Sequence, residues 1–319
     1  MKFSIRLLDY FFVLRPTLFF AVWTVSLAGL WAQNRFAEFE HSAPTRLLMI
    51  GSYDVTYVLW IALFTLIMGG VFILNQVHDF ESDHLNNKLF LIANGEISRQ
   101  AANIESVIII AIPLAIAFWL RPIVGVSMLL TFVVTGWIYS IRPFRWKNRP
   151  ILGLFTNMTG YLLVFSTGWL IYGIPEKNLW LHSLPYILGI TAVYFFTTIP
   201  DINGDKKTNK ITVAVQYGAN KTIWFGFLCN VAAVITSALL KDFVIFIPTV
   251  LAMPFFIYSV FKKSNEQVLR TNKYGTLFLS IVICVRYPIY FLIIFFIFFF
   301  SKWYYKIRFG INYPSFKSS

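Results

Sequence analysis

The chain has 319 residues, of which 58% are hydrophobic and only 13% are charged, whereas soluble domains carry about 25% charged residues. This balance excludes a soluble enzyme held by a single anchor, because apolar runs of about 20 residues recur along the whole length. The net charge of +13 does not indicate nucleic-acid binding, since Lys and Arg gather between the apolar runs, where they meet lipid headgroups. The sequence predicts an all-α, polytopic membrane protein.

Nine apolar segments are predicted to cross the bilayer as helices. In chain order they cover 11–32, 56–77, 104–120, 122–140, 151–173, 180–200, 221–240, 242–261 and 274–300. The first is long enough to span the bilayer, which predicts a retained helix rather than a cleaved signal peptide. The last contains Arg286 and Pro288, which indicates a kink or a polar interior face. We expect residues 1–300 to form one transmembrane domain and residues 301–319 a basic C-terminal tail.

Positive charges predict the orientation of the bundle. If the chain starts in the cytoplasm, most Lys and Arg of the connections fall on the cytoplasmic side of the inner (plasma) membrane, as the positive-inside rule requires. Nine spans would place the basic tail, with Lys302, Lys306 and Arg308, on the opposite side. Either the tail tolerates that side, or the kinked last segment turns back. The two longest connections, 78–103 and 201–220, are cytoplasmic, so we expect the functional site there.

Carboxylates gather at the cytoplasmic ends of two predicted spans. Asn75, Asp79 and Asp83 are four residues apart, which places them on one face of a helix. Asp201 and Asp205 repeat this spacing. Because carboxylates four apart repel one another on a bare helix, such pairs become useful when a divalent cation lies between them. Oxygen ligands at this spacing suit Mg²⁺, which typically binds one or two carboxylates together with substrate phosphates.

Basic residues are predicted on the same cytoplasmic side of the membrane as the two acidic clusters. Arg145 and Lys147 come after the fourth predicted span, and Lys206 directly follows Asp205. Cations beside carboxylates bind the phosphate oxygens that a metal leaves free. The pattern predicts two acidic clusters that hold Mg²⁺ and basic residues that grip a diphosphate, although charged residues at span ends also occur without any catalytic role.

At these positions the sequence resembles the UbiA superfamily of intramembrane prenyltransferases. The matches to its first motif, N-x-x-x-D-x-x-x-D, are Asn75, Asp79 and Asp83, and those to its second, D-x-x-G-D followed by a basic residue, are Asp201, Gly204, Asp205 and Lys206. The segments after the two motifs are also similar, with NGEIS at 94–98 and TVAVQYG at 212–218.

This resemblance implies a helical bundle around a central cavity that opens to lipid and is capped by cytoplasmic loops. It implies transfer of a polyprenyl group from an allylic polyprenyl diphosphate to an acceptor, either an aromatic quinone precursor or another lipid precursor. The catalytic residues that hold Mg²⁺ would be Asp79, Asp83, Asp201 and Asp205. The residues that bind the diphosphate would be Asn75, Arg145, Lys147 and Lys206.

The sequence departs from the superfamily at two places. Thr197-Thr198 stand where the family often has Lys-Asp, and residues 88–91 read KLFL where many members have P-x-R-P. One carboxylate and one arginine are therefore missing, which leaves the acceptor open. Two other classes of protein remain as alternatives, a transporter or ion-coupled carrier with acidic coordination sites and a non-catalytic assembly factor. Acidic residues at span ends, rather than at the bilayer midplane, disfavour the transporter.

Overall fold

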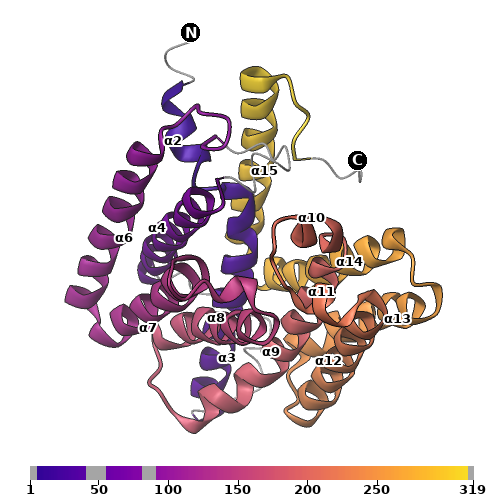
Figure 1. The fold of residues 1–319 in the computed structure, drawn as a ribbon. Helices are drawn as coiled ribbons and strands as arrows, with labels where there is room; N and C mark the ends of the chain where they lie inside the picture. Colours follow the sequence, from indigo (N-terminus) through magenta and orange to yellow (C-terminus); the bar gives the residue numbers. More distant parts are fainter. Residues whose placement is uncertain (1–5, 41–54, 81–90, 315–319) are drawn as a thin grey trace.

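The computed structural model of the chain describes residues 6–40, 55–80 and 91–314 (Figure 1). Every regular element in these ranges is a helix. In chain order the elements are α2 (Asp9–Phe12), η1 (Pro16–Leu18), α3 (Phe19–Glu40), α4 (Val55–His78), α6 (Arg99–Leu120), α7 (Pro122–Phe132), η3 (Val133–Ile138), η4 (Trp146–Asn148), α8 (Pro150–Leu170), α9 (Lys177–Thr198), α10 (Ile202–Lys207), α11 (Val213–Tyr217), α12 (Ala219–Leu239), α13 (Phe243–Lys262), α14 (Asn265–Arg286) and α15 (Pro288–Phe309).

Nine of the described helices are long and apolar enough to cross a membrane, so the predicted all-α polytopic bundle is confirmed. Two segments differ from the prediction. The fourth predicted span is a shorter apolar helix, Pro122–Ile138, in which α7 continues into the turn η3. The last predicted span, 274–300, is two helices, α14 and α15.

The break between α14 and α15 lies at Tyr287. The residue before a proline is disfavoured in a helix, and Tyr287 accordingly has an extended backbone with φ −127° and ψ 80°. α14 also begins before the apolar run does. The Ser264 hydroxyl accepts the amide of Gln267 at 3.3 Å and caps its first turn. Each of the two helices therefore has its own start and its own end.

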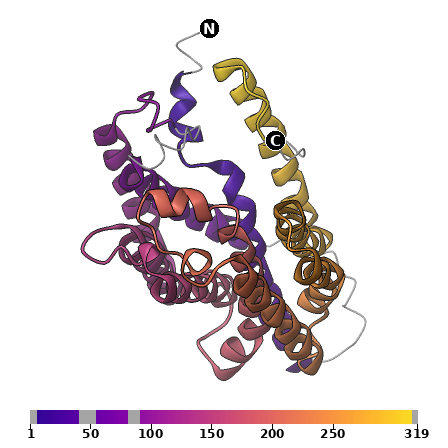
Figure 2. The ribbon, with the colours of Figure 1, turned by 45° about the vertical axis from the view of Figure 1, so that its right-hand side comes forward.

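The second of these helices returns the chain to the end of the bundle where it began. The Tyr304 hydroxyl of α15 donates to Oδ1 of Asp9 in α2 at 2.5 Å. Figures 1 and 2 both show α15 beside α2. The last predicted segment therefore turns back, which brings Lys302, Lys306 and Arg308 to the side of α2. This arrangement removes the conflict with the charge rule, and α15 continues past residue 300 to Phe309.

Close backbone contact holds α3 against α8. A Cβ atom added at Gly29 would lie 1.9 Å from the carbonyl oxygen of Phe165, and one added at Gly168 would lie 1.7 Å from that of Ser26. Both positions therefore require glycine. Small residues at helix crossings let membrane helices pack through their backbones.

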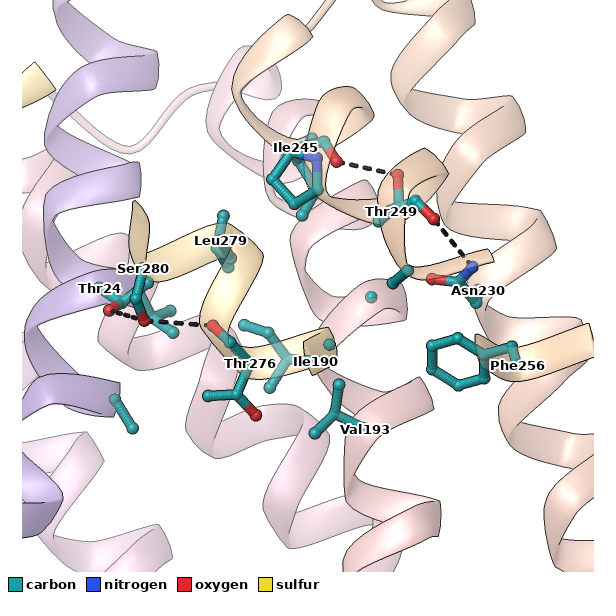
Figure 3. Close-up of a pocket in the computed structure, with 16 residues that line it drawn as sticks. Thr24, Ile190, Val193, Asn230, Ile245, Thr249, Phe256, Thr276, Leu279 and Ser280 are labelled. Carbon is teal, nitrogen blue, oxygen red and sulfur yellow. Dashed lines mark hydrogen bonds between the residues drawn. The ribbon is translucent and has the colours of Figure 1, made fainter. Parts of the chain in front are cut away.

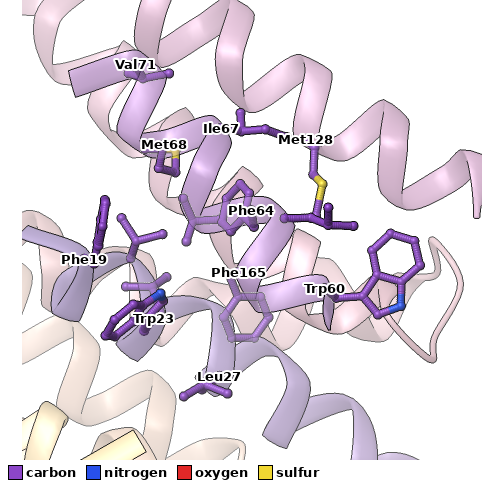
Figure 4. Packing of buried hydrophobic residues seen from close by; sticks show 14 of the residues in the cluster. Phe19, Trp23, Leu27, Trp60, Phe64, Ile67, Met68, Val71, Met128 and Phe165 are labelled. Carbon is purple, nitrogen blue, oxygen red and sulfur yellow. The ribbon is translucent and has the colours of Figure 1, made fainter. Parts of the chain in front are cut away.

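Buried apolar side chains form two clusters. In the larger one, Phe64, Ile67 and Phe165 are almost fully buried where α3, α4 and α8 meet (Figure 4). The smaller cluster lies among α9 and α11–α14, where the rings of Phe196 and Phe256 pack edge to face with centroids 4.9 Å apart. This packing fixes the ends of α4 and α9, from which the two acidic motifs extend.

The turn η3 is a π-helix, which leads directly into Tyr139 and Ser140. A π-helical turn takes one more residue than the α-helical turn that it replaces, and such turns are frequent at functional sites. Here it sets the direction in which Ser140 and the following basic loop leave the helix.

Candidate active site

The first acidic cluster lies where α4 ends. Asp79 follows the last residue of this helix, and its amide donates to the carbonyl of Asn75 at 2.9 Å, so the helical turn continues past the helix end. Its carboxylate Oδ1 lies 2.6 Å from Nζ of Lys147 in η4. The side chain of Lys147 is 4% exposed and that of Asp79 is 33% exposed. The lysine is therefore the buried member of this ion pair.

Ser140 connects this ion pair to the helix face. Its hydroxyl donates to Oδ1 of Asn75 and lies 3.4 Å from Nζ of Lys147. Arg145 donates from its guanidinium to the carbonyl of His78 at 2.9 Å. The structure therefore brings together four of the predicted site residues, Asn75, Asp79, Arg145 and Lys147.

The surroundings of Lys147 have opposing effects on the pKa of its ammonium group. Burial lowers the pKa of this ammonium group, and the nearby charges of Arg145 and Lys210 lower it further. The charge and hydrogen bond of Asp79 raise it, but the balance leaves the pKa below its ordinary value. Asp79 is therefore the neighbour that opposes the fall in this pKa.

The second acidic cluster lies around the short helix α10. Asp201 is exposed at its N-cap, and Asp205 is buried one turn later. Oδ1 of Asp205 lies 3.2 Å from Nζ of Lys210, with side chains that are 11% and 33% exposed, respectively. Burial alone would lower the pKa of Lys210, but the charge and hydrogen bond of Asp205, together with the charges of Tyr139 and Asp79, raise the pKa overall. The predicted Lys206 lies on α10 with an exposed side chain.

The two clusters meet at the basic loop. The amide of Ile211, just beyond the second cluster, donates to the carbonyl of Asn148 in this loop at 3.3 Å. The charge of Asp79 also acts on Lys210, and the charge of Lys210 acts on Lys147. Both predicted motifs are therefore at one end of the bundle. Asp83 lies outside the described residues.

Two residues of this constellation were not predicted from the sequence as part of the site. Lys210 stands five residues after Asp205, as Lys88 stands five residues after Asp83, and that repeated spacing is a signal that could have identified it. Ser140 carries no such signal. Its role depends on the folding of the basic loop back onto α4.

The described donors fit a magnesium ion in their chemistry. Asp79 and Asp205 offer hard carboxylate oxygens, and each already accommodates a cation, a lysine ammonium group, within 3.2 Å or less. In the part of the chain that the structure describes, no three side chains of Asp, Glu, His or Cys converge on one point. Mg²⁺ commonly takes only one or two protein carboxylates and completes its shell with phosphate and water. The chemistry of the two carboxylates therefore fits Mg²⁺.

A small, mainly apolar pocket of about 70 Å³ lies deeper in the bundle, between α3, α9, α12, α13 and α14 (Figure 3). Val193 lines it, about two helical turns before Asp201. Asn230 donates to the carbonyl of Thr249 at 3.1 Å on one side of it. Ligand pockets commonly measure about 300–1,000 Å³. A prenyl chain would therefore fit here only if the lining side chains moved apart.

The order of these motifs matches a known family. Residues 21–282 match the model of the UbiA prenyltransferase family. The chain belongs to the UbiA prenyltransferase family. It is 27% identical over 181 residues to a homogentisate phytyltransferase from Synechocystis sp., covering 52% of this chain and 56% of that protein. It is 26% identical over 218 residues to a digeranylgeranylglyceryl phosphate synthase from Methanosphaera stadtmanae, covering 63% and 75%. The chain spans about half the length of the first curated relatives that it matches.

Solved structures agree with the family at the level of the fold. A digeranylgeranylglyceryl phosphate synthase matches with a TM-score of 0.65 at 18% identity, covering 90% of this chain and 98% of that chain. A UbiA homolog from Archaeoglobus fulgidus bound to GPP and Mg²⁺ matches with a TM-score of 0.63 at 20% identity, covering 87% and 99%. The predicted family and fold are therefore confirmed, and this UbiA-family chain is a multi-pass membrane protein.

Proposed function

We propose that this UbiA-family protein transfers a polyprenyl group from an allylic polyprenyl diphosphate to an acceptor, an aromatic quinone precursor or another lipid precursor, with Mg²⁺ as cofactor. The observation that carries the proposal is the presence of two carboxylate–lysine pairs, Asp79–Lys147 and Asp205–Lys210, at one end of a bundle of the UbiA fold. A metal diphosphate needs carboxylates for the metal and cations for the phosphate oxygens, and this arrangement supplies both. The names of the relatives, phytyltransferase and digeranylgeranylglyceryl phosphate synthase, support the same reaction class.

The proposal gives each set of residues a role. The metal-binding and catalytic residues are Asp79, Asp83, Asp201 and Asp205. The residues that bind the diphosphate are Asn75, Arg145, Lys147 and Lys206, to which the structure leads us to add Lys210. Magnesium bound at these carboxylates would supply a Lewis acid for the departing diphosphate.

The residues of the chain prepare the site for this chemistry. The ammonium groups of Lys147 and Lys210 donate to phosphate oxygens and stabilise the charge that appears when the allylic C–O bond breaks. The electron pair of that bond leaves with the diphosphate. The acceptor supplies the pair for its new bond to the prenyl carbon and releases a proton. Arg145, bound to the carbonyl of His78, holds the end of α4 in place for Asp79.

We also propose that residues 1–300 act as one prenyltransferase domain whose site faces the cytoplasm, in the inner (plasma) membrane. The described helix α2, the C-terminal end of α15 and the basic loop lie at the end of the bundle that holds the acidic clusters. The positive-inside rule places an end with this concentration of Lys and Arg in the cytoplasm.

The test uses the purified chain in detergent with Mg²⁺ and a panel of dimethylallyl, geranyl, farnesyl and geranylgeranyl diphosphates, with and without a lipid extract. Diphosphate release is measured, and prenylated products are identified by mass. We expect Mg²⁺-dependent release that is lost in Asp79→Asn and in Asp205→Asn. The matched control is Glu266→Gln, which changes an exposed carboxylate on α14, paired with Arg270, to an amide.

A folded wild-type protein that neither binds nor cleaves any of these diphosphates would overturn the proposal. Release that persists unchanged in both aspartate variants would overturn the assignment of the site. The mass of the product identifies the acceptor.

A further inference from the structure

The last helix carries an ionic contact that the proposed reaction does not use. Arg308, near the end of α15, lies outside residues 21–282, which match the family. Its guanidinium donates to both carboxylate oxygens of Asp9, at 3.2 and 3.1 Å, and also to Oε2 of Glu96. One side chain therefore joins the N-terminal helix, the C-terminal helix and the segment that follows the first acidic cluster.

The ion pair between Arg308 and Asp9 is buried and fixed in place. The side chain of Asp9 is only 4% exposed, and it also accepts the hydroxyl of Tyr304 at 2.5 Å. The ring of Tyr304 stacks on Phe12 of α2, with centroids 3.7 Å apart. A buried carboxylate that loses its cation is left with an uncompensated charge, so Arg308 is held beside Asp9. The contact with Glu96, whose side chain is 32% exposed, is the half that can change without disturbing the core.

Glu96 belongs to a tight turn between the first acidic cluster and α6. Its amide donates to the carbonyl of Leu91 at 2.9 Å, and the amide of Ile97 donates to the same oxygen at 3.3 Å. The side chains of Leu91 and Ile92 are buried. Ser98 then caps α6, accepting the amide of Ala101 at 3.1 Å. The turn is therefore a compact unit that Arg308 holds from outside.

The same turn is connected to the metal-binding end of α4. Its next residue, Arg99, places its guanidinium 5.2 Å from the ring centroid of Phe80, which directly follows Asp79. Arg308 thus contacts Glu96, and Arg99, three residues further along the chain, contacts Phe80.

We infer that Arg308 is a positioning residue that keeps the turn of residues 91–98, and through it the Asp79 end of α4, in the arrangement that binds the prenyl diphosphate. The inference rests on the proposed function. Arginine suits this role because its planar fork binds two carboxylates at once, which a lysine ammonium does with less defined geometry. Loss of the contact lowers the fraction of molecules that are ready to bind, and this raises the apparent KM while leaving kcat unchanged.

The informative variant is Glu96→Gln, because it breaks the outer contact and keeps Asp9, Tyr304 and Arg308 together. We expect the KM for the prenyl diphosphate to rise about fivefold, the size expected for a partly exposed ion pair, with kcat and thermal midpoint unchanged. Glu266→Gln, which removes a similar charge on α14, leaves KM unchanged. Arg308→Lys raises KM less than Arg308→Gln does, because it keeps the positive charge.

Hydrogen exchange at the amides of Glu96 and Ile97 gives a readout that does not depend on activity. Exchange at both amides becomes several-fold faster in Glu96→Gln and stays unchanged in Glu266→Gln. An active wild type whose Glu96→Gln variant matches Glu266→Gln in KM and exchange would overturn the positioning role alone. A wild type that releases no diphosphate overturns the proposed function and the role in it, whatever the exchange shows.

Discussion

The two carboxylate–lysine pairs of the site are opposite in burial. In the first pair the lysine is the buried member, since Lys147 is 4% exposed and Asp79 is 33% exposed. In the second pair the carboxylate is the buried member, since Asp205 is 11% exposed and Lys210 is 33% exposed. A buried charge is stable only with its partner. Lys147 therefore needs Asp79, whereas Asp205 needs Lys210.

This difference shows what each pair presents to a ligand. The more exposed member, which a ligand meets first, is a carboxylate in the first pair and an ammonium group in the second. In the proposed site, the two pairs are therefore complementary. Substitutions that affect stability and ligand binding to different extents can test this comparison.

The largest effect is expected for Asp79→Asn. Diphosphate release should fall about 100-fold or more, as happens when a group that stabilises transition-state charge is removed. Stability should also fall by about 1–3 kcal/mol, less than for a fully buried pair, because Asp79 is one-third exposed. The double variant Asp79→Asn/Lys147→Met should recover the thermal midpoint in detergent and not the activity. A double variant no more stable than the single one would contradict the assignment of Lys147 as the dependent partner.

Lys210→Met should have an intermediate effect, mainly on binding. We expect the KM for the prenyl diphosphate to rise about tenfold, because a charge-assisted hydrogen bond to phosphate is lost. Lys210→Arg should restore most of the affinity, since it keeps the positive charge. Steady-state kinetics at saturating Mg²⁺ measure both variants. An unchanged KM in Lys210→Met would show that the exposed ammonium does not face the ligand.

A carboxylate remote from the site provides the structural contrast. Asp242 is 1% exposed at the start of α13, where it accepts the Tyr186 hydroxyl at 3.1 Å and caps the helix through the amide of Val244. Asp242→Ala should cost about 1–3 kcal/mol of stability, from the lost cap and the unpaired hydroxyl. The KM should not change. A changed KM, measured on equal amounts of folded protein, would show that Asp242 takes part in substrate binding.

The smallest expected effect is on the pH dependence of stability. The pKa of Lys147 is lowered in the folded state, so the unfolded chain binds more protons between that lowered value and about 10.4, and stability rises with pH across that interval. The pKa of Lys210 is raised, so its contribution is complete below about 10.4 and is lost as pH rises through the folded value. Thermal midpoints measured in EDTA between about pH 8 and 11 should show a flatter rise in Lys147→Met and a smaller decline in Lys210→Met. Parallel curves for wild type and both variants would refute these shifts.

The sequence predicted where the charged groups of the site lie, but not which of them are buried. Asn75 and Asp79, four apart at the end of an apolar run, share a helix face by local geometry alone. The burial of Lys147 depends on η3 and the basic loop, which fold back onto α4. No periodicity encodes that contact, because it joins residues that are 68 positions apart.

At the C-terminal end the sequence predicted one helix where the structure has two, α14 and α15, for a related reason. The first turns of α14 are polar, and hydropathy therefore assigned them to a loop. In the bundle, Gln267 and Thr271 are buried against α13, where the Thr271 hydroxyl lies 2.8 Å from that of Ser259. Ser264 followed by Gln267 is a capping pattern and was the available signal for the true start of the helix.

The π-helical turn η3 has a consequence for the rotation of everything that follows it. Each residue turns an α-helix by about 100°, so the one additional residue in η3 rotates the next segment by about that angle. Ser140 reaches Asn75 from this rotated position. Deleting one residue of η3 would give a helix with an ordinary hydrogen-bonding pattern and a hydroxyl that points more than a quarter of a turn away from α4. The irregular turn thus determines the rotation of the following residues about the helix axis, and the alignment of Ser140 with α4 depends on it.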